Sequence, residues 1–371
     1  MRTPRPATDV PPPAAPASGR RRRGVLVVVA VLAVAGGSYW RWGGGEPGRR
    51  DEALGLAKAG RLAEAEPLLE AALARDANDS EVVSALALAK LNGPDPAAAE
   101  RLLSRWCELR PNEARPFQLR MDLRHRVARG RATTTERLDG LEAALADGRR
   151  VLELEPANDP VRREVAWLAL QASHFAEAER EVRQSLKAAP ADGWLNYLLA
   201  KSLHAQGRRI EAAATLEPVV KAQPNFADAL LLRAILHADD DRHDRAIPLL
   251  RQALALPNPP RRDALYRLGL SLAAVGQADE ARKVMAELDI LNLTGSIENG
   301  HFPNNPAMRT QIAEAMILAG RLSDANSELD AALAADPNFA PAHRAKATYY
   351  DRVGQTDRAA EHRRRAGQDA P

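Results

Sequence analysis

The stretch Gly60-Arg-Leu-Ala-Glu-Ala65 returns near the end of the chain as Gly320-Arg-Leu-Ser-Asp-Ala325. An Ala-Leu pair follows both copies at the same distance, as Ala72-Leu73 and Ala332-Leu333. Related segments lie at 174–178, 207–212 and 276–281. The alanines that align across the middle of the chain are 34, 34 and 35 residues apart, at Ala178, Ala212, Ala246 and Ala281. A fixed period of this length predicts an array of small, stacked structural units.

Three residue types recur within this period and together predict two helices joined by a tight turn. Glycine falls between the two apolar segments, where a positive φ ends the first helix, at Gly60, Gly207, Gly276, Gly320 and Gly354. Proline falls after the second helix and ends it, at Pro111, Pro156, Pro190, Pro224 and Pro337. Alanine falls where the two helices would cross and a larger side chain would force them apart, at Ala65, Ala99, Ala178, Ala212, Ala246, Ala281, Ala325 and Ala359.

This pattern resembles the tetratricopeptide repeat, a helix–turn–helix unit of 34 residues. The resemblance covers residues 51–371 and implies an all-α fold, a right-handed superhelical solenoid of about eight to nine repeats. We place the units at 46–79, 80–113, 114–158, 159–192, 193–226, 227–260, 262–295, 306–339 and 340–371. The third unit has an insertion around 130–135. The helical period breaks at 292–305. This segment is interpreted as an inert insertion, with a hinge between two sub-arrays or a functional edge as the alternatives.

The charge of the chain is divided between its two parts. The whole sequence has 52 Lys and Arg against 49 Asp and Glu, with a pI of about 9.1. Residues 1–50 hold nine arginines and only Asp9 and Glu46 as acids, which leaves 43 basic and 47 acidic residues for 51–371. The array is therefore slightly acidic, and a nucleic-acid partner is not predicted.

The first fifty residues predict a membrane segment. Residues 1–23 form a basic leader without apolar periodicity, which we expect to be disordered and cytoplasmic. Residues 24–42 are apolar, end in Tyr39, Trp40 and Trp42, and predict a transmembrane helix acting as a signal-anchor. Residues 43–50 predict a flexible linker. A cleaved signal peptide ending at Ala35 is the alternative. Both interpretations export the repeat array, to the periplasm or another extracytoplasmic compartment.

The motifs of known chemistry are missing from the sequence. It has no phosphate-binding loop, no nucleophile elbow and no His-Glu-x-x-His metal pattern. His237 and His243 flank Asp239-Asp-Asp241, but this segment falls in a predicted turn, where polar residues are the default. Cys107 is the only cysteine, and we expect it to be a buried thiol. No catalytic, cofactor-binding or metal-binding residue is therefore predicted, and the chain is not expected to be an enzyme.

The resemblance implies that the first helices line a concave groove that binds protein or peptide. Transferring the groove positions of the family gives Arg163, Trp167, Leu170, Trp194, Tyr197, Lys201, His204, Leu231, Ile235, Tyr266 and Leu270. For Trp167 and Tyr197 the alternative is a place in the core between repeats. The asparagine and lysine clamp that some family members use for a carboxylate terminus is not recognisable.

The resulting hypothesis is a membrane-anchored scaffold or adaptor that supports the assembly or localisation of an envelope complex. One alternative is a non-catalytic accessory subunit of an enzyme or of glycan-processing or export machinery. Another is a structural homo-oligomer, since the sequence does not define the oligomeric state.

Overall fold

The computed structural model describes residues 46–131, 133–298 and 305–367. All regular structure in these residues is helical, which confirms the all-α prediction. The 18 helices form nine consecutive pairs: α1 (Glu46–Lys58) and α2 (Leu62–Leu73), α3 (Ser80–Lys90) and α4 (Pro96–Leu109), α5 (Ala114–Arg129) and α6 (Thr134–Leu154), α7 (Asp159–Gln171) and α8 (Phe175–Leu186), α9 (Gly193–Ala205) and α10 (Arg209–Ala222), α11 (Ala227–Ala238) and α12 (His243–Ala255), α13 (Arg261–Ala274) and α14 (Ala278–Glu298), α15 (Pro306–Ala319) and α16 (Leu322–Ala335), and α17 (Ala340–Arg352) and α18 (Thr356–Arg365).

The turn inside most pairs has the predicted left-handed residue. Gly60, Gly207, Gly276, Gly320 and Gly354 all have φ between 77° and 83°. In two pairs the same place is taken by Ser173, with φ 66°, and Asp241, with φ 56°. Only a few polar residues tolerate this conformation besides glycine, so the turn geometry is imposed by the packing of the two helices.

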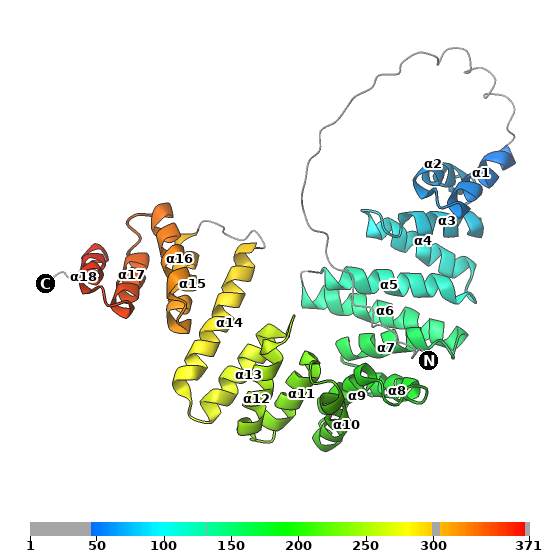
Figure 1. The fold of residues 1–371 in the computed structure, drawn as a ribbon. Coiled ribbons are helices and arrows are strands. Elements are labelled where there is room, and N and C mark those ends of the chain that lie inside the picture. The colour runs from blue at the N-terminus through cyan, green and yellow to red at the C-terminus, as the bar shows by residue number, and fades with distance from the viewer. Residues whose placement is uncertain (1–45, 132, 299–304, 368–371) are drawn as a thin grey trace, which may run out of the picture.

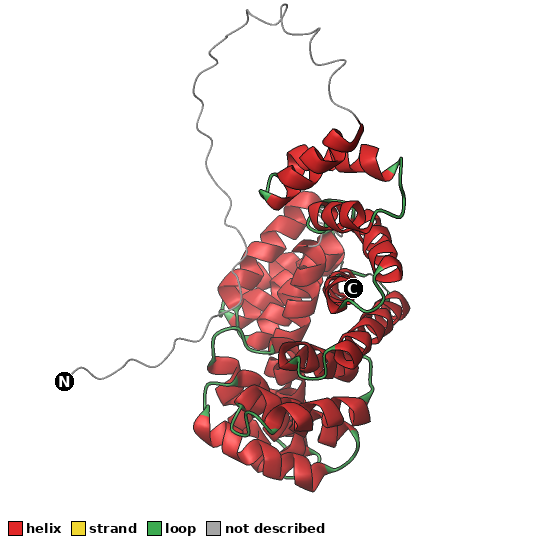
Figure 2. Ribbon diagram, turned by 90° about the vertical axis from the view of Figure 1, so that its right-hand side faces the viewer, coloured by secondary structure: helices red, strands yellow, loops and turns green. Residues whose placement is uncertain are grey.

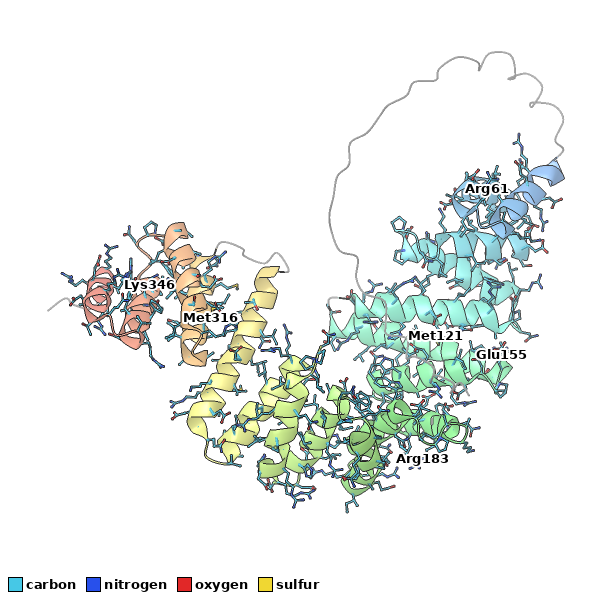
Figure 3. All side chains as sticks on the ribbon, in the orientation of Figure 1. Arg61, Met121, Glu155, Arg183, Met316 and Lys346 are labelled. Atoms are coloured by element: carbon cyan, nitrogen blue, oxygen red, sulfur yellow. The ribbon has the colours of Figure 1, made fainter. Side chains whose placement is uncertain are left out.

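The crossing of the two helices in each pair is as close as the alanine pattern predicts. Seven of these alanines have no exposed surface and Ala281 retains 6%. Leucines on both sides of the crossings complete the core, which is divided along the array into five clusters of buried side chains. Figure 3 shows the result, with Met121 and Met316 between packed helices and Arg61 and Glu155 at the surface.

The stack of helix pairs curves into an open arc from α1 to α18 (Figure 1), and the view at right angles shows that the arc also leaves its plane (Figure 2). Successive first helices pack on one another at α1 and α3, α7 and α9, α9 and α11, α11 and α13, and α15 and α17. No pair of successive second helices in the described chain packs to a similar extent. Because a curved stack brings its inner elements together, the first helices line the inner side.

The structure differs from the sequence-based boundaries in three places. The linker predicted at 43–50 overlaps α1, which begins at Glu46. The insertion predicted around 130–135 appears as added helix length, since α6 has 21 residues. The break predicted at 292–305 is also too long, because α14 continues to Glu298. Leu293 packs on the core formed with α15 and α16, and this burial extends the helix.

The predicted leader at 1–23 and the predicted transmembrane helix at 24–42 lie outside the described residues. Among the helices of the described chain, none combines the length and the apolar character that a membrane crossing needs.

Candidate interaction surface

Four aromatic rings from two successive units, 159–192 and 193–226, gather on the inner side of the arc. The ring centroid of Trp194, at the start of α9, lies 5.6 Å from that of Trp167 on α7, 5.3 Å from Tyr197 and 6.1 Å from Phe226. Tyr197 and Phe226 are 5.2 Å apart. The Nζ atom of Lys201 lies 5.4 Å from the ring centroid of Trp167 and 5.9 Å from that of Tyr197. The tilted rings and the ammonium group over them fix the cluster in one arrangement.

The predicted groove residues divide by exposure. Trp194, Tyr266 and Leu270 are 41%, 46% and 45% exposed, and Tyr266 and Leu270 lie one turn apart on α13. Five others are half-buried: Arg163, Trp167, Lys201, His204 and Ile235. These eight lie on first helices and keep part of their surface exposed.

Three predicted groove residues lie in the core instead. Leu170, Tyr197 and Leu231 retain only 6–7% of their surface. Leu170 and Tyr197 belong to one cluster of buried side chains and Leu231 to the next, so all three fill the space between packed helices. Burial, with the charges of Asp228 and Asp263 as smaller causes, raises the pKa of Tyr197 well above its usual range.

Two of the predicted polar groove residues already have partners. Arg163 binds Asp159 at 2.8 Å and Asp192 at 2.6 Å, and Nε2 of His204 lies 2.7 Å from Oδ2 of Asp239. These interactions link α7, α9 and the end of α11. The two groups therefore contribute to the stability of the inner wall and have little capacity left for a ligand.

Sequence reasoning missed Phe226, Asp228 and Asp263. Phe226 is the residue that precedes α11, outside the first-helix positions that were transferred. Asp228 and Asp263 occupy the first turns of α11 and α13, at the repeat position of Trp194. The 34-residue period contained this signal, because 194, 228 and 263 are separated by one repeat each.

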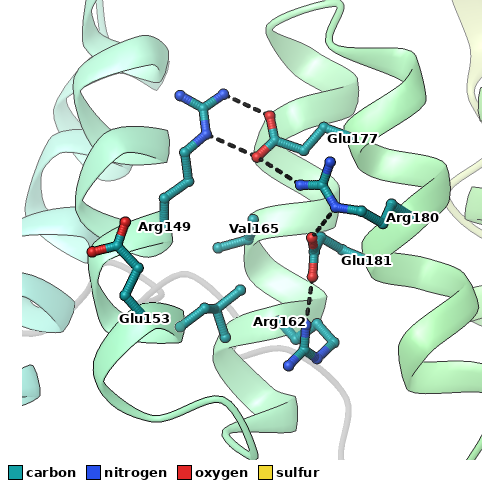
Figure 4. A pocket seen from close by; sticks show the side chains of 8 residues that line it. Arg149, Glu153, Arg162, Val165, Glu177, Arg180 and Glu181 are labelled. Atoms are coloured by element: carbon teal, nitrogen blue, oxygen red, sulfur yellow. Dashed lines mark hydrogen bonds and ion pairs between the residues drawn. The ribbon is translucent and has the colours of Figure 1, made fainter.

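The hollow formed by α6, α7 and α8 is filled with mutually paired charges (Figure 4). It has a volume of about 500 Å³. Arg149 donates two hydrogen bonds to Glu177, at 2.8 and 2.6 Å. Glu181 accepts from Arg162 at 2.5 Å and from Arg180 at 2.9 Å. Because these carboxylates are already bound by arginines, the hollow is a structural contact between units.

A buried charge cluster also joins α5 to α6. Asp147 is 3% exposed, accepts two hydrogen bonds from Arg120, at 2.9 and 2.6 Å, and one from Arg124 at 2.8 Å. Arg124 also binds Glu100 of α4 at 2.7 Å. Cys107 is buried as expected, and this burial raises the pKa of its thiol to about 11. The thiol is therefore protonated at neutral pH and unreactive.

The last unit holds a pair of histidines. Nδ1 of His343 lies 2.8 Å from Nδ1 of His362, and Nε2 of His343 lies 3.0 Å from the carbonyl oxygen of Pro337. A carbonyl oxygen only accepts, so Nε2 of His343 carries a hydrogen, and one hydrogen is shared between the two Nδ1 atoms. The pKa of His362 is lowered, mainly by burial and to a smaller extent by the charges of His343, Lys346 and Arg365. Within the described residues, no group of three or more potential metal ligands is formed.

Comparison with known proteins agrees with the repeat pattern. Two family models, both described as tetratricopeptide repeat, match the chain, one at 197–260 and 241–291 and the other at 56–121 and 299–349. The uncharacterized protein y4yS of Sinorhizobium fredii is 36% identical over 102 residues, which are 28% of this chain and 56% of that protein. The chain thus spans about half the length of this curated relative.

Two solved structures are similar at lower sequence identity. Residues 41 to the end of MamA from Desulfovibrio magneticus RS-1 share 16% identity, with coverage of 47% of this chain and 92% of that one and a TM-score of 0.40. The C-terminal part of a TPR repeat-containing protein from Cytophaga hutchinsonii shares 14%, with coverage of 80% and 98% and a TM-score of 0.39. At these scores neither structure bears on the function of this chain.

Proposed function

The chain is a tetratricopeptide repeat protein, and we propose that it is a scaffold that holds a protein or peptide partner on the inner side of its arc. Repeat arrays of this kind use their extended concave surface for binding. Proteins of this family are generally non-catalytic scaffolds, which supports a role without catalysis.

The observation that carries the proposal is the exposure of Trp194. A tryptophan residue that is 41% exposed presents apolar surface to water, which is unfavourable in the free protein. Three neighbouring rings hold it in place, so little conformational entropy is lost when a partner covers it. Large, pre-positioned aromatic side chains are the residue type that dominates the binding energy of protein interfaces.

The finer part of the proposal concerns location. We propose that residues 24–42 anchor the chain in a membrane, that the repeat array is exported, and that the scaffold supports the assembly or localisation of an envelope complex. The arginine-rich leader before the apolar segment supports this orientation. An intact-mass measurement of the chain from its native membrane tests the anchor. Retention of residues 1–35 in a membrane-bound chain is expected, and a mature chain that begins after Ala35 would refute it.

Partner binding is tested by crosslinking the full-length chain in its native cells and identifying the captured proteins. We compare the unchanged chain with Trp194→Ala and with a matched control, Ile210→Ala. Ile210 is 88% exposed on the second helix α10, away from the inner surface. A specific partner captured by the unchanged chain and the control, and reduced roughly tenfold or more by Trp194→Ala, supports the proposal. Equal capture by all three chains would refute it, provided that circular dichroism shows the same helix content.

A further inference from the structure

We infer that the partner segment on the inner surface is cationic, with lysine or arginine side chains that bind Asp228 and Asp263 beside Trp194 and Tyr266. This inference rests on the proposed function, since it specifies the chemistry of the ligand at the same surface. It is carried by the position of the two carboxylates, by their lack of partners and by the aromatic rings next to them.

The two carboxylates occupy, in the sixth and seventh units, the repeat position that Trp194 occupies in the fifth. Trp194, Asp228 and Asp263 lie in the first turns of α9, α11 and α13, and the packing of α9 on α11 and of α11 on α13 brings these turns together. Both aspartates are exposed. Both are also close enough to Tyr197 for their charges to raise the pKa of its phenol, after the larger effect of burial. The carboxylates therefore border the aromatic cluster.

Neither carboxylate is neutralised within the described chain. Asp228 and Asp263 take part in no hydrogen bond or ion pair there, although other inner acids, such as Asp192 and Asp239, are bound by Arg163 and His204. The hydroxyl of Tyr197 likewise has no hydrogen-bond partner among the described residues, although the residue is only 6% exposed. This border of the cluster thus has free acceptors, in contrast to Asp192 and Asp239.

The aromatic cluster already binds one cation. The ammonium group of Lys201 lies over Trp167 and Tyr197, while the indole of Trp194 and the ring of Tyr266 remain 41% and 46% exposed. Among the described residues, no ammonium or guanidinium group lies over the ring of Trp194 or Tyr266, so these two rings are open to a second cation near the carboxylates. A guanidinium or ammonium group placed there gains both an aromatic face and a carboxylate.

The spacing of the carboxylates defines the ligand further. Packed helices are about 8–10 Å apart, which is too far for two aspartates on neighbouring helices to chelate one metal ion. A peptide in the polyproline II conformation advances about 3.1 Å per residue and has three residues per turn, so side chains three positions apart lie on the same face. Basic side chains three positions apart in such a peptide would therefore reach Asp228 and Asp263 together. A polyproline II segment of the form Lys-x-x-Lys or Arg-x-x-Arg fits the two carboxylates.

The experiment measures the fluorescence anisotropy of short labelled peptides with the full-length chain. One peptide has lysine at every third position, and its partner has glutamate at the same positions. The test variant is Asp228→Asn with Asp263→Asn. The control is Asp244→Asn with Asp289→Asn, because these exposed aspartates lie on the second helices α12 and α14. Asp244 is also in a first turn, which matches any effect on the helix dipole.

We expect the lysine peptide to bind more tightly than the glutamate peptide, and added salt to weaken that binding. The test variant should lower the affinity for the lysine peptide about tenfold, since each exposed carboxylate contributes modestly, and the control should leave it unchanged. Equal affinity for both peptides, or an equal loss in both variants, would overturn the inference. If the crosslinked partner depends on Trp194 but not on the two aspartates, the scaffold function stands and the cationic ligand is refuted. If the partner depends on neither, the proposed function itself fails.

Discussion

Substitution of Gly148 by alanine tests how closely the first and second helices of neighbouring units pack. Gly148 lies in the middle of α6 and is buried. A Cβ atom added there would lie 2.5 Å from Cγ2 of Val165 and 2.9 Å from Sδ of Met121. Both distances are far shorter than a normal contact between non-bonded heavy atoms. Alanine can therefore be accommodated only if α6 and α7 move apart or Val165 leaves its place.

The structure indicates the sign and size of the effect. Alanine in a helix interior is about 1 kcal/mol more favourable than glycine. Val165 is 1% exposed and β-branched, so it has essentially one rotamer in a helix and cannot withdraw. Overpacking of this kind costs about 1–3 kcal/mol, and we expect the upper part of that range to apply. The net result is a loss of about 1–2 kcal/mol for Gly148→Ala.

Two other glycines provide matched controls within the same chain. No atom lies within 4 Å of a Cβ added at Gly55 in α1, so Gly55→Ala should stabilise the first unit by about 0.5–1 kcal/mol. A Cβ at Gly269 would meet Sδ of Met285 at 2.6 Å. Methionine is flexible and can move aside, so this substitution should have a smaller effect than Gly148→Ala.

Amide hydrogen exchange of the full-length chain is the assay, because stability in a repeat array is determined by each unit and its neighbours. For Gly148→Ala we expect exchange in α5, α6 and α7 to become roughly 5- to 30-fold faster, which corresponds to about 1–2 kcal/mol, with α15 to α17 unchanged. Gly55→Ala should slow exchange in α1 and α2. Unchanged or slower exchange around Gly148 would show that α6 and α7 are not packed as described.

Three further predictions concern the buried polar groups. Asp147→Ala leaves two arginines without their shared partner and should lower the free energy of unfolding by about 3–5 kcal/mol. Asp351→Ala removes an exposed ion pair and should lower it by only about 0–1 kcal/mol. Urea denaturation compares the two variants, and equal losses would contradict the burial argument. The lowered pKa of His362 means that the folded last unit binds fewer protons than the unfolded one, so the unit is most stable above about pH 6.5 and loses stability as the pH falls below that value. Amide hydrogen exchange in α18, measured as a function of pH, should show this loss. The variant His362→Gln should remove the pH dependence. Cys107, with a thiol pKa of about 11, should react slowly with a thiol reagent at pH 8 and rapidly after unfolding, and rapid reaction in the folded chain would place it at the surface.

The fold could be predicted from sequence because the signals are local and repeated. Gly320 marks a turn and Ala325 marks a crossing in the same way as Gly60 and Ala65 do, so several weak signals support one period. The turns at Ser173 and Asp241 have the same left-handed geometry without glycine, and only the period locates them. The end of α14 was not predictable in this way, because its last turns are stabilised by contacts with the next unit and not by a local signal.

The candidate site was predictable only in part, as Tyr197 and Tyr266 show. They occupy equivalent positions two repeats apart, yet they are 6% and 46% exposed. Phe226, at the entrance to α11, covers Tyr197, and α11 packs on α9. Periodicity identifies the position on the helix, but exposure depends on how closely the next first helix approaches. That distance is a tertiary property.

No following first helix approaches α13 closely, and the cause is the irregular length of α14. α14 has 21 residues, and α15 packs on α14 and on α17 rather than to a comparable extent on α13 (Figure 1). The side of α13 that would meet a following first helix therefore stays open, which leaves Tyr266 exposed. Tyr266, whose equivalents Tyr197 and Leu231 are buried in the preceding units, thus becomes part of the surface that continues from Trp194. The long helix of the seventh unit is then a determinant of the inner surface, because α15 packs on α14 and leaves this side of α13 uncovered.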